Sequence, residues 1–176
     1  MAINSKKKGN KFELSVSKWL TKWTGYKFER NRAGSGAWHS NRDATSDITC
    51  VDPKHQHRCR ISVECKSYKD IKFEHVLLGN KGCDIEKFWS QAVKDAHRAS
   101  KFPILCMRYN SMPREEFFFA VPFSIYDEFS DIHCKAHMIL GLETGEKIVI
   151  FMASDVIREI DYKAIHKVVK KILKSS

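Results

Sequence analysis

The spacing of apolar side chains predicts three helices. Between residues 9 and 24, apolar residues recur at intervals of three and four, the repeat of one buried helical face: Phe12, Val16, Trp19, Leu20 and Trp23. Gly25 follows directly and predicts the end of this helix. The same spacing predicts a second helix over 86–101 and a third, with lysines on its outer side, over 161–173.

Runs rich in β-branched and aromatic residues predict strands over 26–30, 47–51, 60–66, 102–109, 116–121 and 147–152. Asp52-Pro53-Lys54 favours a turn, so we expect the second and third of these strands to form a hairpin. Residues 31–45 are polar, contain glycine and lack a period, which predicts a loop. The sum is one α/β domain, with a central mixed β-sheet flanked by helices.

Composition is consistent with one compact intracellular domain. The chain has 176 residues, of which 43% are apolar, enough for a real core across residues 1–176. No run of about eighteen apolar residues occurs, and the start is charged, so we expect a cytoplasmic protein without a membrane partner. Its six cysteines form no Cys-x-x-Cys pair, which favours reduced thiols over disulfides.

The net charge of +10 is concentrated at the start of the chain. Residues 1–42 contain ten basic and two acidic side chains, a net charge of +8. Such a concentration favours a polyanionic partner through phosphate neutralisation and counterion release. A solvated basic face is the simpler structural alternative, and charge alone does not distinguish DNA from RNA or a membrane surface.

Three acidic positions and one lysine suggest phosphodiester chemistry. On a strand, Glu64 and Lys66 point to one face, while Cys65 points to the other. Asp47 arrives from the neighbouring strand, and Glu13 lies at the border of the buried helical stripe, an unusual place for a merely solubilising residue. Two carboxylates beside an ammonium can hold Mg²⁺ and polarise a phosphate.

Each of these residues also has a structural interpretation. Glu13 can be a helix-start charge favoured by the macrodipole, and Asp47 a strand-start cap. Glu64 and Lys66 can form a simple ion pair on an exposed strand. Gln91, on the second helix, can be an ordinary solvated residue. It is their joint order along the chain that favours a catalytic role.

A group of soft ligands across the hairpin turn raises the question of zinc. Four of them lie within ten residues: Cys50, His55, His57 and Cys59. Their spacing matches no common zinc module, so a His-rich surface turn is the simpler account and we do not expect zinc. A second, weaker group comprises His133, Cys134 and His137.

The order of the motifs resembles the PD-(D/E)xK nuclease superfamily, and within it the Holliday junction resolvases of the archaeal and phage type. Those enzymes share a Lys/Gly-rich start with a helical Glu, an Arg near a strand end, a Ser-Gly loop, Asp-Ile, Glu-x-Lys and a helical Gln. The matching positions here are Lys8-Gly9-Asn10-Lys11-Phe12-Glu13, Arg30, Ser35-Gly36, Asp47-Ile48, Glu64-Cys65-Lys66 and Gln91. The resemblance covers residues 8 to about 108. It departs at Ser46, where many members have Pro, in a longer stretch over 67–85, and after Met112.

The resemblance implies a restriction-endonuclease-like fold and a divalent-metal-dependent endonuclease that leaves a 5′-phosphate. It places the nuclease core at about 8–122, followed by an extension over 123–176 that ends in a basic amphipathic helix. Mg²⁺ or Mn²⁺ would be held by Glu13, Asp47, Glu64 and the backbone carbonyl of Cys65. Lys66 would orient or help deprotonate the attacking water, and Gln91 would position Lys66 or that water.

The resemblance also implies the substrate. Phosphates near the scissile bond would be held by Arg30, Arg32, Ser35 and Arg42, and the basic start of the chain adds Lys6, Lys7, Lys8 and Lys11 as DNA contacts. We expect branched DNA, such as a Holliday junction, to be cleaved by a homodimer. Two alternatives remain open: a restriction-like or repair nuclease on other DNA, and a nucleic-acid-binding protein on a nuclease scaffold that does not cleave.

Overall fold

The computed structural model describes residues 2–31, 46–79, 83–127 and 136–175. The elements are α1 (Ala2–Thr24), β1 (Phe28–Arg30), β2 (Ile48–Cys50), the short 3-10 helix η2 (Gln56–Arg58), β3 (Ile61–Tyr68), α2 (Glu74–Leu77), α3 (Asp84–Arg98), β4 (Phe102–Tyr109), β5 (Phe118–Pro122), α4 (Phe123–Asp127), β6 (His137–Gly141), β7 (Lys147–Met152), α5 (Ala153–Glu159) and α6 (Tyr162–Ser175). The predicted α/β class, with a mixed sheet flanked by helices as in restriction endonucleases, is confirmed.

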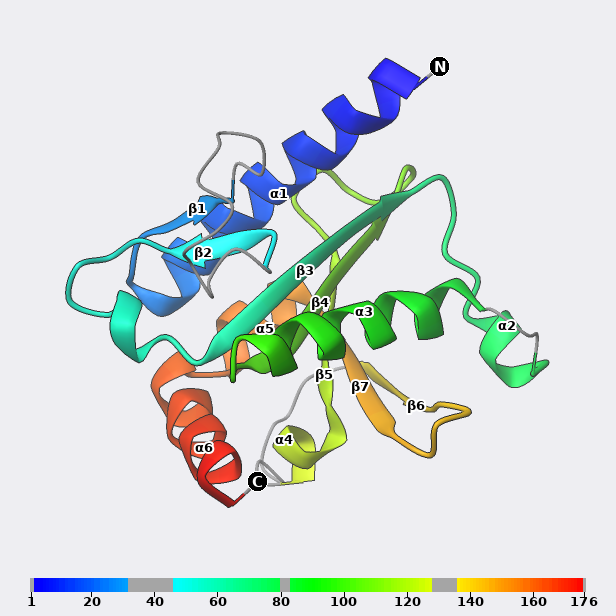
Figure 1. The fold of residues 1–176 in the computed structure, drawn as a ribbon. Helices are drawn as coiled ribbons and strands as arrows, with labels where there is room; N and C mark the ends of the chain where they lie inside the picture. The colour runs from blue at the N-terminus through cyan, green and yellow to red at the C-terminus, as the bar shows by residue number, and fades with distance from the viewer. Residues whose placement is uncertain (1, 32–45, 80–82, 128–135, 176) are drawn as a thin grey trace.

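One seven-stranded sheet organises the chain, with the strand order β1-β2-β3-β4-β5-β7-β6. β3 and β4 are parallel, whereas all the other neighbouring strands pair antiparallel. The parallel pair needs a crossover connection, and α3 supplies it across one face of β3 and β4 (Figure 1). The expected hairpin is present, because β2 pairs antiparallel with β3.

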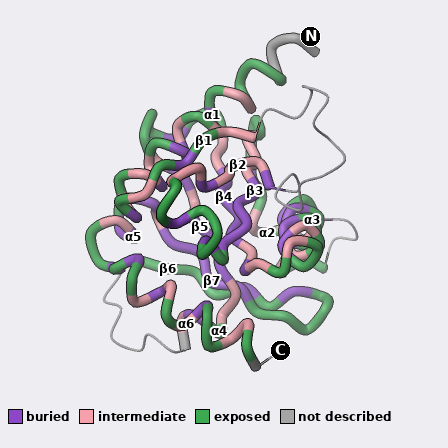
Figure 2. Tube along the Cα trace, turned by 60° about the vertical axis from the view of Figure 1, so that its left-hand side comes forward, coloured by how far each residue is buried: buried purple, intermediate pink, exposed green. Residues whose placement is uncertain are grey.

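The two faces of the sheet bury two separate apolar cores. Ile61 and Val63 of β3 belong to the core that α1, α5 and α6 cover, while α3 covers the other core. Because side chains alternate along a strand, Glu64 and Lys66 face α3. Figure 2 shows the buried residues concentrated along the central strands, with exposed positions on the surrounding helices and turns.

α1 begins at Ala2, seven residues before the predicted start, and ends at Thr24 as predicted. Gly25 has φ +75° and donates its N–H to the carbonyl of Thr21 at 3.0 Å, the left-handed ending that glycine favours. At this end of the helix the indole of Trp23 donates to the carbonyl of Ile160 at 2.7 Å, which ties α1 to the segment between α5 and α6.

Five elements were not predicted: η2, α2, α4, α5 and β6. α4 and α5 are short helices of five and seven residues that begin directly after β5 and β7, too short to show a helical period. β6 is an edge strand with four exposed residues out of five, so it lacks an alternating pattern. Residues 123–176 thus add β6 and β7 to the same sheet. Within the described ranges, no helix combines the length and apolar character needed to cross a membrane.

Candidate active site

The pairing of β2 with β3 brings two acidic residues together. Ile48 lies opposite Val63, and Asp47, just before β2, donates its N–H to the carbonyl of Val63 at 3.1 Å. The carboxylate of Asp47 accepts the N–H of Cys65 at 2.8 Å. Asp47 is therefore attached to β3 by its backbone and its side chain, beside Glu64.

Ser46 fastens the same junction, a role that the sequence interpretation did not assign. Its buried hydroxyl accepts the N–H of Val63 at 2.8 Å and lies 2.9 Å from the carbonyl of Ile48 and 3.0 Å from that of Val63. Asn31 adds a further tie, because its side-chain amide donates to the carbonyl of Ser46 at 3.1 Å. The only sequence signal for this clamp is a small hydroxyl residue directly before the acidic one.

The environment of Asp47 and Glu64 favours their protonated forms. Glu64 is 5% exposed, and burial, together with the negative charge of Asp47, raises its pKa to about 7 despite the opposing charge of Lys66. Burial likewise raises the pKa of Asp47, more than the hydrogen bond from Cys65 lowers it. These two carboxylates thus lie close together with too little positive charge around them.

Lys66 occupies a well-defined position between β3 and α3. Its ammonium is 2.7 Å from the carboxylate of Glu64, and it donates to the side-chain carbonyl of Gln91 at 2.8 Å. The ring of Phe88, one turn before Gln91 on α3, lies 5.7 Å from the same nitrogen. Glu64 and Lys66 share one strand face as their spacing predicts, and Gln91 contacts Lys66. Phe88 was not singled out from the sequence.

Glu13 lies at the edge of this cluster. Its carboxylate accepts the Nε of Arg30 at 2.7 Å, and Arg30 also donates to the side-chain oxygen of Asn10 at 2.7 Å. The charge of Glu13 is near enough to Asp47 to contribute to its raised pKa. Arg30 therefore links α1 to β1 at the border of the site, and its guanidinium is already engaged with Glu13.

The residues expected to contact DNA are distributed unevenly. Lys6, Lys7, Lys8 and Lys11 are all exposed on α1. Three further predicted positions lie outside the described residues: Arg32, Ser35 and Arg42.

The donor set suits a hard divalent cation, which prefers carboxylate and carbonyl oxygens. Asp47 and Glu64 supply two carboxylates that lack sufficient counter-charge. In a β-strand the N–H and carbonyl of one residue point to the same edge, so the carbonyl of Cys65 is directed toward Asp47 along with its N–H. Nowhere in the described ranges do three His, Cys, Asp or Glu side chains gather as metal donors. The fit therefore rests on two carboxylates and this carbonyl.

Most of the possible zinc ligands at the hairpin turn lie in the protein interior rather than on its surface. Cys50, His55 and Cys59 are buried, so the expected surface turn describes only the exposed His57. The ring of His55 stacks on Tyr26 at 3.8 Å between centroids, and its Nε2 lies 2.9 Å from the hydroxyl of Tyr162. His133 and Cys134 lie outside the described residues.

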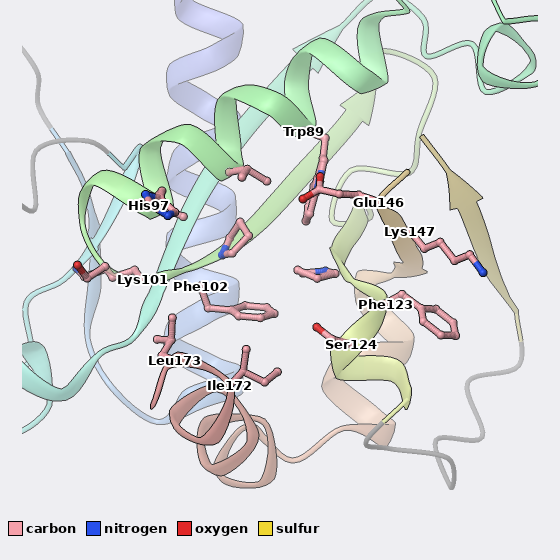
Figure 3. Close-up of a pocket in the computed structure, with 15 residues that line it drawn as sticks. Trp89, His97, Lys101, Phe102, Phe123, Ser124, Glu146, Lys147, Ile172 and Leu173 are labelled. Atoms are coloured by element: carbon pink, nitrogen blue, oxygen red, sulfur yellow. The ribbon is translucent and has the colours of Figure 1, made fainter. Parts of the chain in front are cut away.

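A cavity of about 740 Å³ lies away from the carboxylate pair, between α3, α4 and α6. Figure 3 shows that aromatic and aliphatic side chains surround it, with Phe102, Phe123 and Ile172 among them. Glu146, the one carboxylate among its described lining residues, accepts the indole N–H of Trp89 at 3.0 Å. This cavity has no acidic pair, which separates it from the site on β3.

Comparison with known proteins points to nucleases. The model of the family described as "Phage putative PDDEXK endonuclease" matches residues 4–167. Protein D14 of Escherichia phage T5 is 27% identical over 150 residues, which cover 85% of this chain and 89% of that protein. No solved structure matches the chain significantly.

Proposed function

This chain belongs to the phage PDDEXK endonuclease family, and we propose that it is a divalent-metal-dependent DNA endonuclease whose site is built around Asp47, Glu64 and Lys66. The observation that carries the proposal is the contact of Glu64, Lys66 and Gln91 on one face of β3, with Asp47 attached beside them. A buried ion pair by itself contributes little to stability, because the cost of desolvation offsets the attraction between the charges. A pair of carboxylates with an adjacent ammonium, in contrast, suits phosphodiester hydrolysis.

Mg²⁺ or Mn²⁺ would be held by Asp47, Glu64 and the carbonyl of Cys65, with Glu13 completing the acidic cluster directly or through water. When bound, such an ion polarises the phosphate and lowers the pKa of a bound water. The raised pKa of Glu64 supports this assignment, because a cation would offset the repulsion between two desolvated carboxylates. Asp47 and Glu64 would release any shared proton as the cation binds.

Lys66 would place its ammonium where the attacking water and a phosphate oxygen approach. Glu64 and Gln91 hold that nitrogen from two elements, so its position does not depend on a flexible four-carbon chain alone. Its charge would offset part of the charge that develops on the phosphate. Gln91 would act through Lys66, as a positioning residue.

For the substrate we propose branched DNA, such as a Holliday junction, cleaved by a homodimer that brings two sites to one junction. The support is the order of motifs, which resembles that of junction resolvases, together with the basic first quarter of the chain. We further propose that residues 1–176 form one nuclease domain. Both β6 and β7 extend the sheet that carries the site, and the family match continues to residue 167.

Cleavage of four-way junction, duplex and single-stranded DNA in the presence and absence of Mg²⁺ tests the proposal, with Glu64→Gln and Lys66→Met beside the wild type. We expect metal-dependent, paired cuts in the junction that either substitution slows by about 10²-fold or more, and a dimer in sedimentation. Cutting at the wild-type rate in both variants would remove the proposed site. Equal cutting of plain duplex would favour a nuclease on other DNA, and tight binding without any cutting would favour a non-cleaving scaffold.

A further inference from the structure

A groove of about 790 Å³ runs beside the middle of α1. Its basic lining residues come from two distant parts of the chain. Three lie on α1, Lys8, Lys11 and Lys18, and two lie near and after the end of β4, Arg108 and Arg114. Among the described lining residues, Glu115 is the one acidic side chain. We call this the α1 groove. The five basic and one acidic lining residues give the groove a net charge of +4. Its concave surface thus brings together basic side chains that are far apart in the sequence.

Most of these cations have no ion-pair partner among the residues that the structure describes. Lys11, Lys18 and Arg114 are exposed, and their side chains make no ion pair with any residue that the structure describes. Arg108 differs, because it donates to the carbonyls of Met112 and Arg114 at 3.1 and 3.0 Å and so supports the loop that forms the far wall. Arg108 therefore stabilises one wall of the groove, while the exposed basic residues supply its positive charge.

The groove opens directly behind the proposed site. Lys66 and Ser67 are consecutive on β3 and so point to opposite faces, and Ser67, which lines the groove, pairs in register with Arg108 of β4. The groove therefore adjoins the end of β3 that carries Lys66, on the opposite face of the sheet.

The dimensions suit a polyphosphate backbone. From Lys8 to Lys18 the helix rises about 15 Å at ~1.5 Å per residue. One strand of a duplex presents a phosphate about every 3.4 Å along its axis, so this length spans about four phosphates. That number is comparable with the net charge of the groove. Leu14, 48% exposed beside these lysines, offers an apolar surface to the sugars between the phosphates.

We propose that the α1 groove binds the phosphate backbone of the DNA arm that flanks the scissile bond, an inference that rests on the proposed nuclease function. The alternative is a solvated basic helix face, as on α6, where exposed Lys167 lies on a surface that lines neither cavity. The concave shape and the two converging segments distinguish the groove from that case. The groove thus adds Lys18, Arg108 and Arg114 to the DNA contacts expected from sequence.

The test compares Lys18→Ala/Arg114→Ala with the charge-matched control Arg58→Ala/Lys167→Ala, all four being exposed residues. Binding to a labelled duplex of about 30 base pairs, three helical turns, is measured by fluorescence anisotropy in EDTA across a range of salt. We expect the groove variant to bind about tenfold or more weakly and to lose about 1 to 2 from the slope of log K against log salt. The control should retain the wild-type slope within about 0.5.

Binding in EDTA separates the two proposals, because it requires neither metal nor cleavage. Wild-type affinity and slope in the groove variant, or an equal loss in the control, would overturn the groove while leaving the nuclease proposal intact. Absence of any cutting by the wild type, with the groove-specific loss still present, would overturn the nuclease proposal and retain the groove as a DNA-binding surface. Thermal unfolding of each variant verifies that these surface changes leave the fold intact.

Discussion

The two faces of strand β3 carry charge in opposite ways. On the α3 face, Glu64 and Lys66 are largely buried, and their charged groups lie 2.7 Å apart, with Gln91 a further 2.8 Å from the ammonium. On the α1 face, Ser67 opens onto a groove whose lysines are exposed and unpaired among the described residues. Buried charges are governed by their immediate contacts and by desolvation, whereas exposed ones respond mainly to salt.

We infer from this difference that the two faces of β3 have separate roles, catalysis on the α3 face and DNA binding on the α1 face. In the buried cluster, water is scarce, so a carboxylate and an ammonium can change the protonation of their neighbours. In the groove, water screens each charge, and only the sum over several lysines gives affinity. Substitutions on the α3 face should therefore change rate and pH dependence, while substitutions on the α1 face should change affinity and its salt dependence.

The strongest test of this separation is Glu64→Gln. We expect cleavage to fall by about 10³-fold or more, because the proposed site loses a carboxylate that no other side chain replaces. DNA affinity in EDTA should stay within about twofold of wild type, since the groove is untouched. Single-turnover cleavage and anisotropy measure the two effects. The exposed carboxylate of Glu143 provides the matched control, Glu143→Gln, which should cleave normally.

Lys66→Met should have the next largest effect, a loss of cleavage of about 10²-fold. The change also leaves Glu64 buried without its ammonium, so the variant should be destabilised. That destabilisation should be greater at about pH 8 than at about pH 5, since Glu64 can take up a proton at the lower pH. Denaturant unfolding at both pH values measures it. Equal destabilisation at the two values would mean that Glu64 is not charged beside Lys66.

Strand and helix periods predicted the scaffold of this arrangement and part of the cluster. A spacing of two was enough to predict that Glu64 and Lys66 share a face, and their ion pair shows that they do. The position of Asp47 against β3 depends on the hydroxyl of Ser46, and the charge of the groove depends on Arg108 and Arg114. Such contacts join residues far apart in sequence, so no local pattern contains them.

The missed elements have a related physical cause. β6 exposes Met138 and Ile139 at the sheet edge, so its apolar residues do not alternate with polar ones. The spacing of Cys50, His55 and Cys59 matches no common zinc module, which favours a His-rich surface turn, yet all three are buried, the two cysteines in the core to which α6 contributes. Burial of a polar residue depends on which distant element covers it, and the sequence pattern does not state that.

A third prediction concerns pH in the metal-free protein. The pKa of Glu64 is about 7 in the folded state against an ordinary value of 4.5, so the folded state binds its proton more tightly than the unfolded state does. The contribution of Glu64 to the free energy of unfolding should therefore be largest below about pH 4.5 and fall as pH rises to about 7, where the effect levels off. Glu64→Gln should flatten this decline, and Lys18→Ala should not. Urea unfolding across pH in EDTA measures the slopes, and a wild-type slope in Glu64→Gln would contradict the assignment.

The smallest predicted effect belongs to Gln91, which reaches the chemistry only through Lys66. Gln91→Met keeps the length and bulk of the side chain but removes the carbonyl that accepts the ammonium at 2.8 Å. One such hydrogen bond near the surface contributes about 1 kcal/mol, so we expect about a fivefold fall in the single-turnover rate at saturating DNA.

Gln91→Glu separates positioning from simple packing, because it restores an acceptor for the ammonium of Lys66. It should recover more of the rate than Gln91→Met does, while both variants should bind DNA in EDTA like the wild type. Equal rates for the two variants would mean that Gln91 only fills space beside Phe88. A loss of DNA affinity in Gln91→Met would mean that the α3 face also holds the substrate, and the division of labour between the two faces of β3 would then fail.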